Sequence, residues 1–238
     1  MIPYKDENPT LLTPVVTLGI IALNLIAWLF IEGAGAGEAV AASVCQLGMI
    51  PAELTRAVPS GTPVPGLACI IDTPHYITVI TSMFLHGGWL HIIGNMWFLW
   101  VFGNNIEDST GHARFAVFYL ICGVVAAGTQ LLADPHSRVP MVGASGAISG
   151  VLGAYILLYP RVRVHTLLPL GFFVTTVALP AYVMLGYWFV LQVVLGLAGP
   201  RGAGGIAVWA HVGGFVAGVV LIKLFVNPLL MAQHEVHV

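Results

Sequence analysis

Six apolar segments, each long enough or nearly long enough to cross a lipid bilayer as a helix, occupy most of this 238-residue chain. A crossing helix needs about 20 apolar residues. The segments are residues 14–31, 76–102, 115–132, 145–159, 180–197 and 206–226. Charged residues make up only 8% of the chain, whereas a soluble domain carries roughly a quarter. The sequence therefore predicts an all-α polytopic membrane protein with a bundle of six transmembrane helices.

The connections between these segments are brief, apart from the loop of residues 32–75, for which we expect short surface helices and turns. Residues 167–177 are also apolar but too short to span, and we predict an interfacial or re-entrant piece. The chain then forms one membrane domain (1–238). Its parts are an N-terminal segment (1–13), a core (14–226) that includes the long outer loop (32–75), and a tail (227–238).

Basic residues indicate the orientation, because loops rich in Lys and Arg stay in the cytoplasm. With six spans, the side of the termini has Lys5, Arg114, Arg161, Arg163 and Lys223, and the other side has Arg56, Arg138 and Arg201. We therefore expect both termini in the cytoplasm. The net charge of −2 and the lack of a basic run give no sign of a nucleic-acid partner. Compact loops, and no leader of the organelle type, favour the plasma membrane of a prokaryote.

Polar side chains inside lipid are costly and are candidates for function by default. Ser145 opens the fourth span, His211 lies near the start of the sixth, and His86, His91 and Asn95 fall early in the second. In the predicted topology all three spans run from outside to inside. We therefore expect these five side chains to share one layer toward the outer leaflet. The fourth span is short, which predicts that Ser145 lies below the outer surface in a water-containing pocket.

Glycine is spaced along one side of both the fourth and the sixth span. The glycines near Ser145 are Gly146, Gly150 and Gly153, and those near His211 are Gly214 and Gly218. Small residues at such spacing let two membrane helices approach closely. The pattern predicts that the two spans touch and bring the Ser145 hydroxyl to the His211 imidazole. General helix packing without chemistry is the alternative interpretation.

A serine, a histidine and hydrogen-bond donors are the groups that acyl transfer requires. His211 is the natural base for the Ser145 proton and would later protonate the leaving amine. No Asp or Glu lies at the same depth, so we predict a dyad whose imidazole is placed by packing. The backbone N–H groups that begin the fourth helix, with the side chains of Asn95 and His91, would form the oxyanion hole.

Each of these polar residues also has another interpretation. Asn95 can form a hydrogen bond between helices that has no role in catalysis. His86, His91 and His211 can be metal ligands, although no Cys, Asp or Glu accompanies them. We expect no metal or cofactor, and we interpret His86 either as a residue at the rim of the site or as one that supports the catalytic residues from behind. Structural roles are expected for Ser149, Asn24 and Glu107, the last of which ties down the turn before Gly111. Cys45 and Cys69 share the long loop, and their pairing stays open.

Three motifs together resemble the rhomboid intramembrane serine proteases. The first is His-Gly-Gly-Trp-Leu-His-Ile-Ile-Gly-Asn at 86–95, and the second is Gly-Ala-Ser-Gly, which runs from Gly143 to Gly146. The third is Ala-His-Val-Gly-Gly at 210–214, followed by Gly218. The resemblance covers roughly residues 81–220, and Glu107 to Gly111 is similar to the Glu-x-x-x-Gly of the family. It implies six core helices, Ser145 as nucleophile, His211 as base, and His91, Asn95 and the Ser145 N–H in the oxyanion hole.

The resemblance also implies single-span membrane proteins as substrates, cut near the outer end of the span, often after a small residue. Membrane lipids surround the protein, and the fifth span, with Pro180 and Gly186, is our candidate gate for substrate entry. Two features depart from the family. Ser149 stands where some members have an aromatic residue against the histidine, and the Trp-Arg pair of some outer loops is absent.

Two other functions stay open from the sequence. A catalytically inactive relative would bind membrane segments as a chaperone or trafficking factor, but such relatives lose the catalytic pair. A transporter or channel would use the buried histidines and Asn95 to line a polar path.

Overall fold

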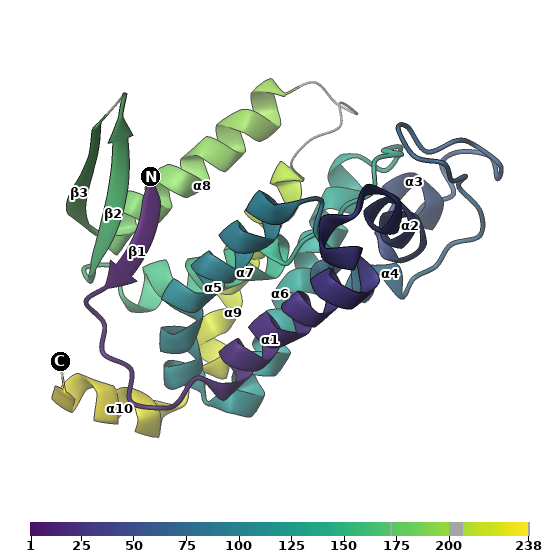
Figure 1. Ribbon diagram of the computed structural model, residues 1–238. Helices are drawn as coiled ribbons and strands as arrows, with labels where there is room; N and C mark the ends of the chain where they lie inside the picture. Colours follow the sequence, from purple (N-terminus) through teal and green to yellow (C-terminus); the bar gives the residue numbers. More distant parts are fainter. Residues whose placement is uncertain (172, 200–206, 238) are drawn as a thin grey trace.

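The computed structural model describes residues 1–171, 173–199 and 207–237 (Figure 1). Two residues used in the predictions lie outside the described residues: Arg201, counted for the orientation, and Ile206, the expected start of the sixth span. The main helices are α1 (Val15–Ile26), continued by a π-helical turn (Ala27–Ile31), α5 (Trp89–Thr110), α6 (His112–Ala133), α7 (Ser145–Leu158), α8 (Ala181–Ala198) and α9 (Val208–Phe225). Each corresponds to one of the expected segments.

The second segment differs most from its prediction, because the helix does not begin at residue 76. Residues 76–88 contain a short helix, α4 (Thr78–Thr81), a 3₁₀ turn (Ser82–Phe84) and an extended stretch up to Gly88. Two consecutive glycines, at 87 and 88, disfavour helix because glycine loses the most conformational freedom on folding. Helix α5 therefore starts at Trp89, and His86 lies before it rather than inside a span.

The long loop forms short helices, as expected: a 3₁₀ turn (Gly33–Gly35), α2 (Gly37–Leu47) and α3 (Pro51–Leu54). A disulfide joins Cys45 to Cys69 and answers the question that the sequence left open. Ile50, Val64 and Ile71 are buried together in this region. The loop therefore has a small core of its own, closed by a covalent link.

A three-stranded antiparallel sheet contradicts the all-α prediction. Its strands are β1 (Ile2–Asp6), β2 (Arg163–Leu170) and β3 (Phe173–Pro180), in the order β1-β2-β3. The segment expected to be interfacial or re-entrant is thus a β-hairpin, which turns at Gly171 with φ +62°. Its valines and threonines favour strands. The N-terminal residues form the third strand, and no local pattern predicts this pairing because the two segments are far apart in the sequence.

Two side chains fasten this sheet to the helices. The Tyr155 hydroxyl of α7 donates to the Asp6 carboxylate, and the Trp97 indole of α5 donates to the Pro3 carbonyl. Burial raises the pKa of the Asp6 carboxyl to about 6, against the lowering effect of the Tyr155 hydrogen bond. The N-terminal segment is therefore part of the folded domain. The tail forms a further helix, α10 (Pro228–His237).

Helix α7 is at the centre of the bundle. Every residue from Ala147 to Tyr155 is buried, and α7 packs against α5, α6, α8 and α9. Helix α8 lies at the edge (Figure 1) and buries only Ala181, Met184, Leu185 and Gln192. The serine that begins α7 therefore sits on the most enclosed helix of the bundle.

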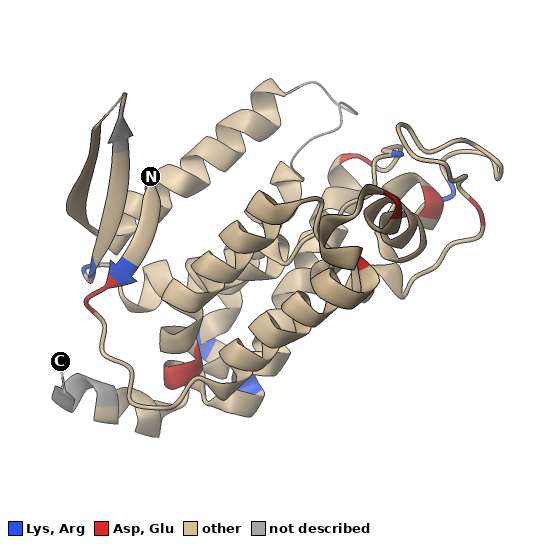
Figure 2. Cartoon of the chain, in the orientation of Figure 1, with Lys and Arg blue, Asp and Glu red and all other residues tan. Residues whose placement is uncertain are grey.

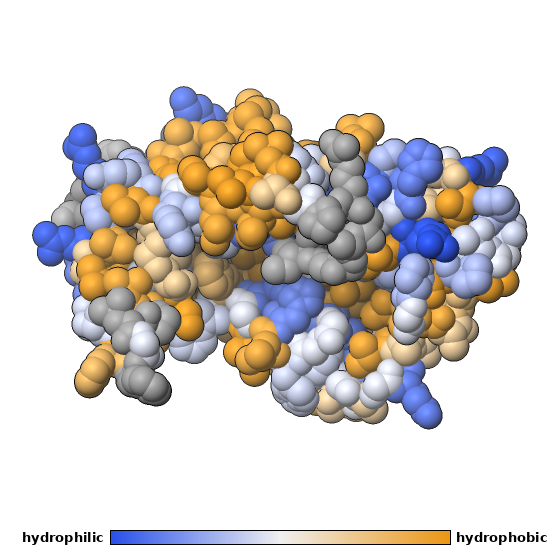
Figure 3. Space-filling view, turned by 90° about the horizontal axis from the view of Figure 1, so that it is seen from above, coloured by the Kyte–Doolittle hydropathy of each residue, from blue (hydrophilic) through white to orange (hydrophobic). Residues whose placement is uncertain are grey.

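The outer surface of the helices is apolar. Leu90 is 88% exposed, Leu132 86% and Val220 65%, which in water would form unusually large apolar patches. Figure 2 shows charged residues near the sheet, at the lower ends of the helices and in the loop region, with few between. Figure 3 shows extensive apolar surface around a hollow where hydrophilic side chains are visible. This surface suits lipid.

Among the described residues, α6, α8 and α9 are long and apolar enough to cross a membrane, and residues 15–31 and α7 are shorter apolar helices. Helix α5 is also 22 residues long, but its last two turns include Asn104, Asn105, Glu107 and Asp108. The structure is thus a mostly helical membrane bundle with a small sheet.

Glu107 connects three segments. Its carboxylate accepts the backbone N–H groups of Val16 and Thr17 at 2.9 and 2.8 Å, and the Thr17 hydroxyl at 2.7 Å. These N–H groups belong to the first turn of α1, which has no intrahelical partners for them. His112, just after Gly111, also contacts this carboxylate at 2.6 Å. Glu107 therefore ties down the α5–α6 turn, as expected, and in addition caps α1.

Candidate active site

Ser145 is the first residue of α7 and is half-buried. The turn before it requires glycine, because Gly143 has φ +121°, a conformation that L side chains rarely adopt. The Gly143 N–H donates to the Ser82 carbonyl at 2.9 Å, which fixes this turn against the chain that precedes α5. The N–H groups in the first turn of α7 have no acceptor within the helix, so they are donors beside the Ser145 hydroxyl.

The Ser145 hydroxyl lies 2.8 Å from Nε2 of His211. His211 is in the first turn of α9 and is 8% exposed. The two residues are 66 positions apart in sequence. The structure thus brings a hydroxyl and an imidazole into hydrogen-bond contact in a largely buried place.

Glycine permits this contact, because α7 and α9 touch through their backbones. A β-carbon on Gly218 would overlap the Gly150 carbonyl, and one on Gly214 would overlap the Gly146 carbonyl. In the same way, a β-carbon on Gly153 would overlap the carbonyl of Phe215. The helices approach as closely as the glycine pattern predicts.

Two residues of α8 hold the other side of the His211 ring. The Gln192 Oε1 lies 2.9 Å from Nδ1 of His211, and the Trp188 ring is 5.8 Å from the imidazole, centroid to centroid. The prediction that packing alone places His211 is therefore wrong. The Ser149 hydroxyl instead donates to the Ser145 carbonyl of its own helix.

Sequence reasoning missed both of these α8 residues. The available signal was that Gln192 is the only amide or charged side chain in the sequence of α8. A lone polar side chain in an apolar span is a functional candidate. Its partner could not be read from the sequence, because it lies on another helix.

His91 lies beside Gly143. Its Nε2 is 2.7 Å from the position that a β-carbon on Gly143 would occupy, and the Ser145 Oγ is 3.6 Å from the same position. The Gly87 N–H donates to Nδ1 of His91 at 3.3 Å. Because Nδ1 accepts, a neutral ring has its proton on Nε2, which faces the space that Gly143 leaves open.

Asn95 is buried one turn further along α5, 6% exposed. Its amide donates to the His91 carbonyl at 2.8 Å. This bond uses one of the two amide N–H groups, so a second remains. The structure thus places His91 near Ser145 directly, while the Asn95 amide bonds the backbone of its own helix.

Of the two positions predicted for His86, the rim is wrong, because the residue is fully buried. Its ring lies 5.0 Å from that of His91, and its backbone N–H donates to the Glu32 carboxylate at 2.7 Å. Neither ring nitrogen of His86 has a hydrogen-bond partner among the described residues. Burial raises the pKa of Glu32 to about 6, and the His86 hydrogen bond opposes this rise. Glu32, just past the first span, was also missed.

Within the described residues, no three His, Cys, Asp or Glu side chains form a group that could hold a metal ion. The interpretation of His86, His91 and His211 as metal ligands therefore has no geometric support.

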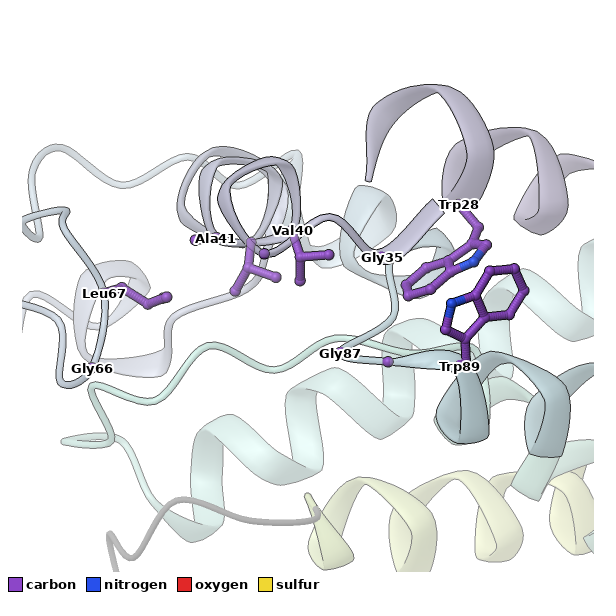
Figure 4. A pocket seen from close by; sticks show the side chains of 11 residues that line it. Trp28, Gly35, Val40, Ala41, Gly66, Leu67, Gly87 and Trp89 are labelled. Carbon is purple, nitrogen blue, oxygen red and sulfur yellow. The ribbon is translucent and has the colours of Figure 1, made fainter. Parts of the chain in front are cut away.

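A cavity of about 360 Å³ lies between α2 and the residues just before α5 (Figure 4). Trp28 and Trp89 meet at its edge, with ring centroids 5.2 Å apart. Gly87 and Gly88 also line it. Its lining does not include Ser145 or His211.

The chain matches known proteins over much of its length. Residues 73–228 match a family model described as the Rhomboid domain. Rhomboid-like protein 11, chloroplastic, of Arabidopsis thaliana is 31% identical over 159 residues, 63% of this chain and 53% of that protein. The putative rhomboid protease YdcA of Bacillus subtilis (strain 168) is 29% identical over 147 residues, 62% of this chain and 63% of that protein.

RHOMBOID-like protein 5 of Arabidopsis thaliana is 37% identical over 78 residues, 33% of this chain and 25% of that protein. The chain therefore spans less than two thirds of the length of each of these relatives. Because the domain model covers more than half of the chain and includes Ser145 and His211, the chain belongs to the rhomboid family, whose members are generally serine proteases that act within membranes.

Proposed function

We propose that this chain is an intramembrane serine endopeptidase that works through Ser145 and His211. The observation that carries the proposal is the 2.8 Å contact between the Ser145 hydroxyl and Nε2 of His211. A serine hydroxyl is a weak nucleophile until a base removes its proton. An imidazole at this distance can take that proton as the hydroxyl attacks the scissile carbonyl.

In the proposed reaction, the Ser145 oxygen bonds to the carbonyl carbon and His211 accepts the hydroxyl proton. His211 then donates this proton to the amine that leaves, and water hydrolyses the acyl-enzyme by the same route. The backbone N–H groups at the start of α7 and the Nε2–H of His91 would stabilise the oxyanion. The space beside Gly143, near both His91 and Ser145, supports this role. Asn95 would contribute through its second amide N–H.

The proposed substrates are single-span membrane proteins, cut near the outer end of the span. A substrate helix must unwind to expose the bond, so helix-breaking residues nearby should favour cleavage. The proposal includes six spans and cytoplasmic termini. The Cys45–Cys69 disulfide supports an outer position for the long loop, since disulfides persist in oxidising compartments. We propose the plasma membrane of a prokaryote as the location.

The test is covalent labelling of the purified protein by a fluorophosphonate, together with cleavage of a fluorogenic transmembrane substrate. We expect Ser145→Ala to abolish both while the thermal midpoint in detergent changes little, because Ser145 is half-buried and small. His211→Ala should also abolish labelling. A wild-type protein that neither reacts with the probe nor cleaves the substrate would favour the inactive chaperone alternative and end this proposal.

A further inference from the structure

Gln192 is the one amide among the four buried residues of α8. Much of this helix is exposed, with Tyr187 55% and Val190 58% exposed, whereas Gln192 is only 7% exposed. Its Oε1 lies 2.9 Å from Nδ1 of His211. The one amide of an apolar, lipid-facing helix is thus turned inward onto the histidine that contacts Ser145.

The orientation of this amide points to the nitrogen of His211 that has the proton. With the amide oxygen of Gln192 facing the ring, Nδ1 is the donor, because an amide oxygen can only accept. In a neutral imidazole the other nitrogen, Nε2, is then unprotonated. Nε2 is the atom that lies 2.8 Å from the Ser145 hydroxyl. The other tautomer would present an N–H to Ser145 and could not act as its base.

We propose that Gln192 is a positioning residue of this active site: it holds His211 in the tautomer and orientation that remove the Ser145 proton. This inference rests on the proposed protease function and adds a third member to the pair. A carboxylate often has this position in serine hydrolases, where it orients the histidine. Here a neutral amide would do so without placing a charge inside the membrane.

The location of Gln192 couples the base to the position of α8. Helix α8 has the smallest buried share of the three candidate spans, at 22%. It contacts α9 through Phe189, whose ring stacks on Phe215 at 4.5 Å between centroids. A displacement of α8, such as the gate movement expected of the fifth span, would separate Gln192 from His211. The site would then be at full activity only with α8 closed.

The first experiment compares Gln192→Leu and Gln192→Glu with the wild type. We expect Gln192→Leu to lower kcat roughly fivefold, which corresponds to about 1 kcal/mol for one neutral hydrogen bond, with little change in KM. Gln192→Glu keeps an acceptor and should restore most of kcat at high pH. Its carboxylate stabilises the charged imidazolium, which should move the acid limb of the pH–rate profile to higher pH. Val190→Leu, on the lipid side of the same helix, is the control.

A merely structural role would lower thermal stability without these changes in kcat and pH profile. If wild-type protein is active and Gln192→Leu has the wild-type kcat and pH profile, the inference fails while the protease function stands. If wild-type protein is inactive, the protease function fails first. The ¹⁵N NMR spectrum of His211 in folded Ser145→Ala protein gives a readout that needs no activity, and a proton on Nε2 rather than Nδ1 would overturn the inference.

The second experiment is a double-mutant cycle with Phe189→Ala, which loosens the contact between α8 and α9. The readout is the rate of fluorophosphonate labelling, since a small probe needs no gate. We expect Phe189→Ala to slow labelling in the wild-type background and to have no further effect beside Gln192→Leu. The same factor in both backgrounds, including no effect in either, would contradict coupling through Gln192.

Discussion

The carboxylate of Glu32 accepts a hydrogen bond of 2.7 Å from the backbone N–H of His86, which lies 54 residues later in the chain. This bond joins the end of the first span to the loop that precedes α5. The same loop includes Gly87, whose N–H donates to His91. A contact outside the proposed catalytic pair thus helps to hold the loop that bonds the proposed oxyanion histidine.

We expect Glu32→Ala to lower the free energy of unfolding by about 1–3 kcal/mol, because it leaves the buried His86 N–H without an acceptor. Glu32→Gln keeps an acceptor oxygen and should cost less. Thermal unfolding in detergent measures both. Glu38→Ala is the matched control, since Glu38 is exposed on α2. Equal midpoints for Glu32→Ala and Glu38→Ala would show that the bond contributes nothing.

The burial of the Asp6 carboxyl predicts a pH dependence of stability. The pKa of Asp6 is raised to about 6 in the folded protein from 3.8, so the folded state keeps its proton to higher pH than the unfolded state. Stability therefore falls as pH rises from about 4 to about 6, by at most about 3 kcal/mol, and is constant above. We expect Asp6→Asn to remove this slope: its thermal midpoint should exceed the wild-type midpoint at pH 7.5 and equal it at pH 4. A parallel fall of both proteins would refute the assignment.

The close approach of α7 and α9 makes Gly218 sensitive to the smallest side chain. In Gly218→Ala the new methyl group meets the Gly150 carbonyl, so the helices must separate. Overpacking of this kind costs about 1–3 kcal/mol, and the Ser145–His211 contact should lengthen and labelling slow. Gly128→Ala on α6 is the control, because nothing lies within 4 Å of its β-carbon. Normal labelling of Gly218→Ala would mean that the contact tolerates helix separation.

The disulfide predicts the behaviour of the outer loop. Cys45 and Cys69 enclose a loop with a sequence separation of 24 residues, for which cross-linking contributes about 3 kcal/mol. We expect the Cys45→Ser/Cys69→Ser variant to lose thermal stability and to become sensitive to protease between these positions. Reduction of the wild type should have the same effect, and reduction of the variant none. A variant as protease-resistant as the wild type would show that the loop core suffices.

Local sequence determined much of this protein, because hydrophobic length and residue spacing act along one helix. The apolar segments predict the helices of the bundle, apart from the start of the second. The glycines at 146, 150, 214 and 218 predict the contact that brings Ser145 to His211, since a missing side chain is visible in the sequence itself.

Tertiary structure alone decided what lies around that contact. The Gln192–His211 and Glu32–His86 hydrogen bonds join residues that no periodicity relates. The sheet likewise depends on β1 pairing with β2 across most of the chain. Both glycines before Trp89 disfavour helix, but the apolar run around them conceals where α5 begins. Hydrogen bonds between distant segments depend on how helices pack, and packing is a property of the whole fold.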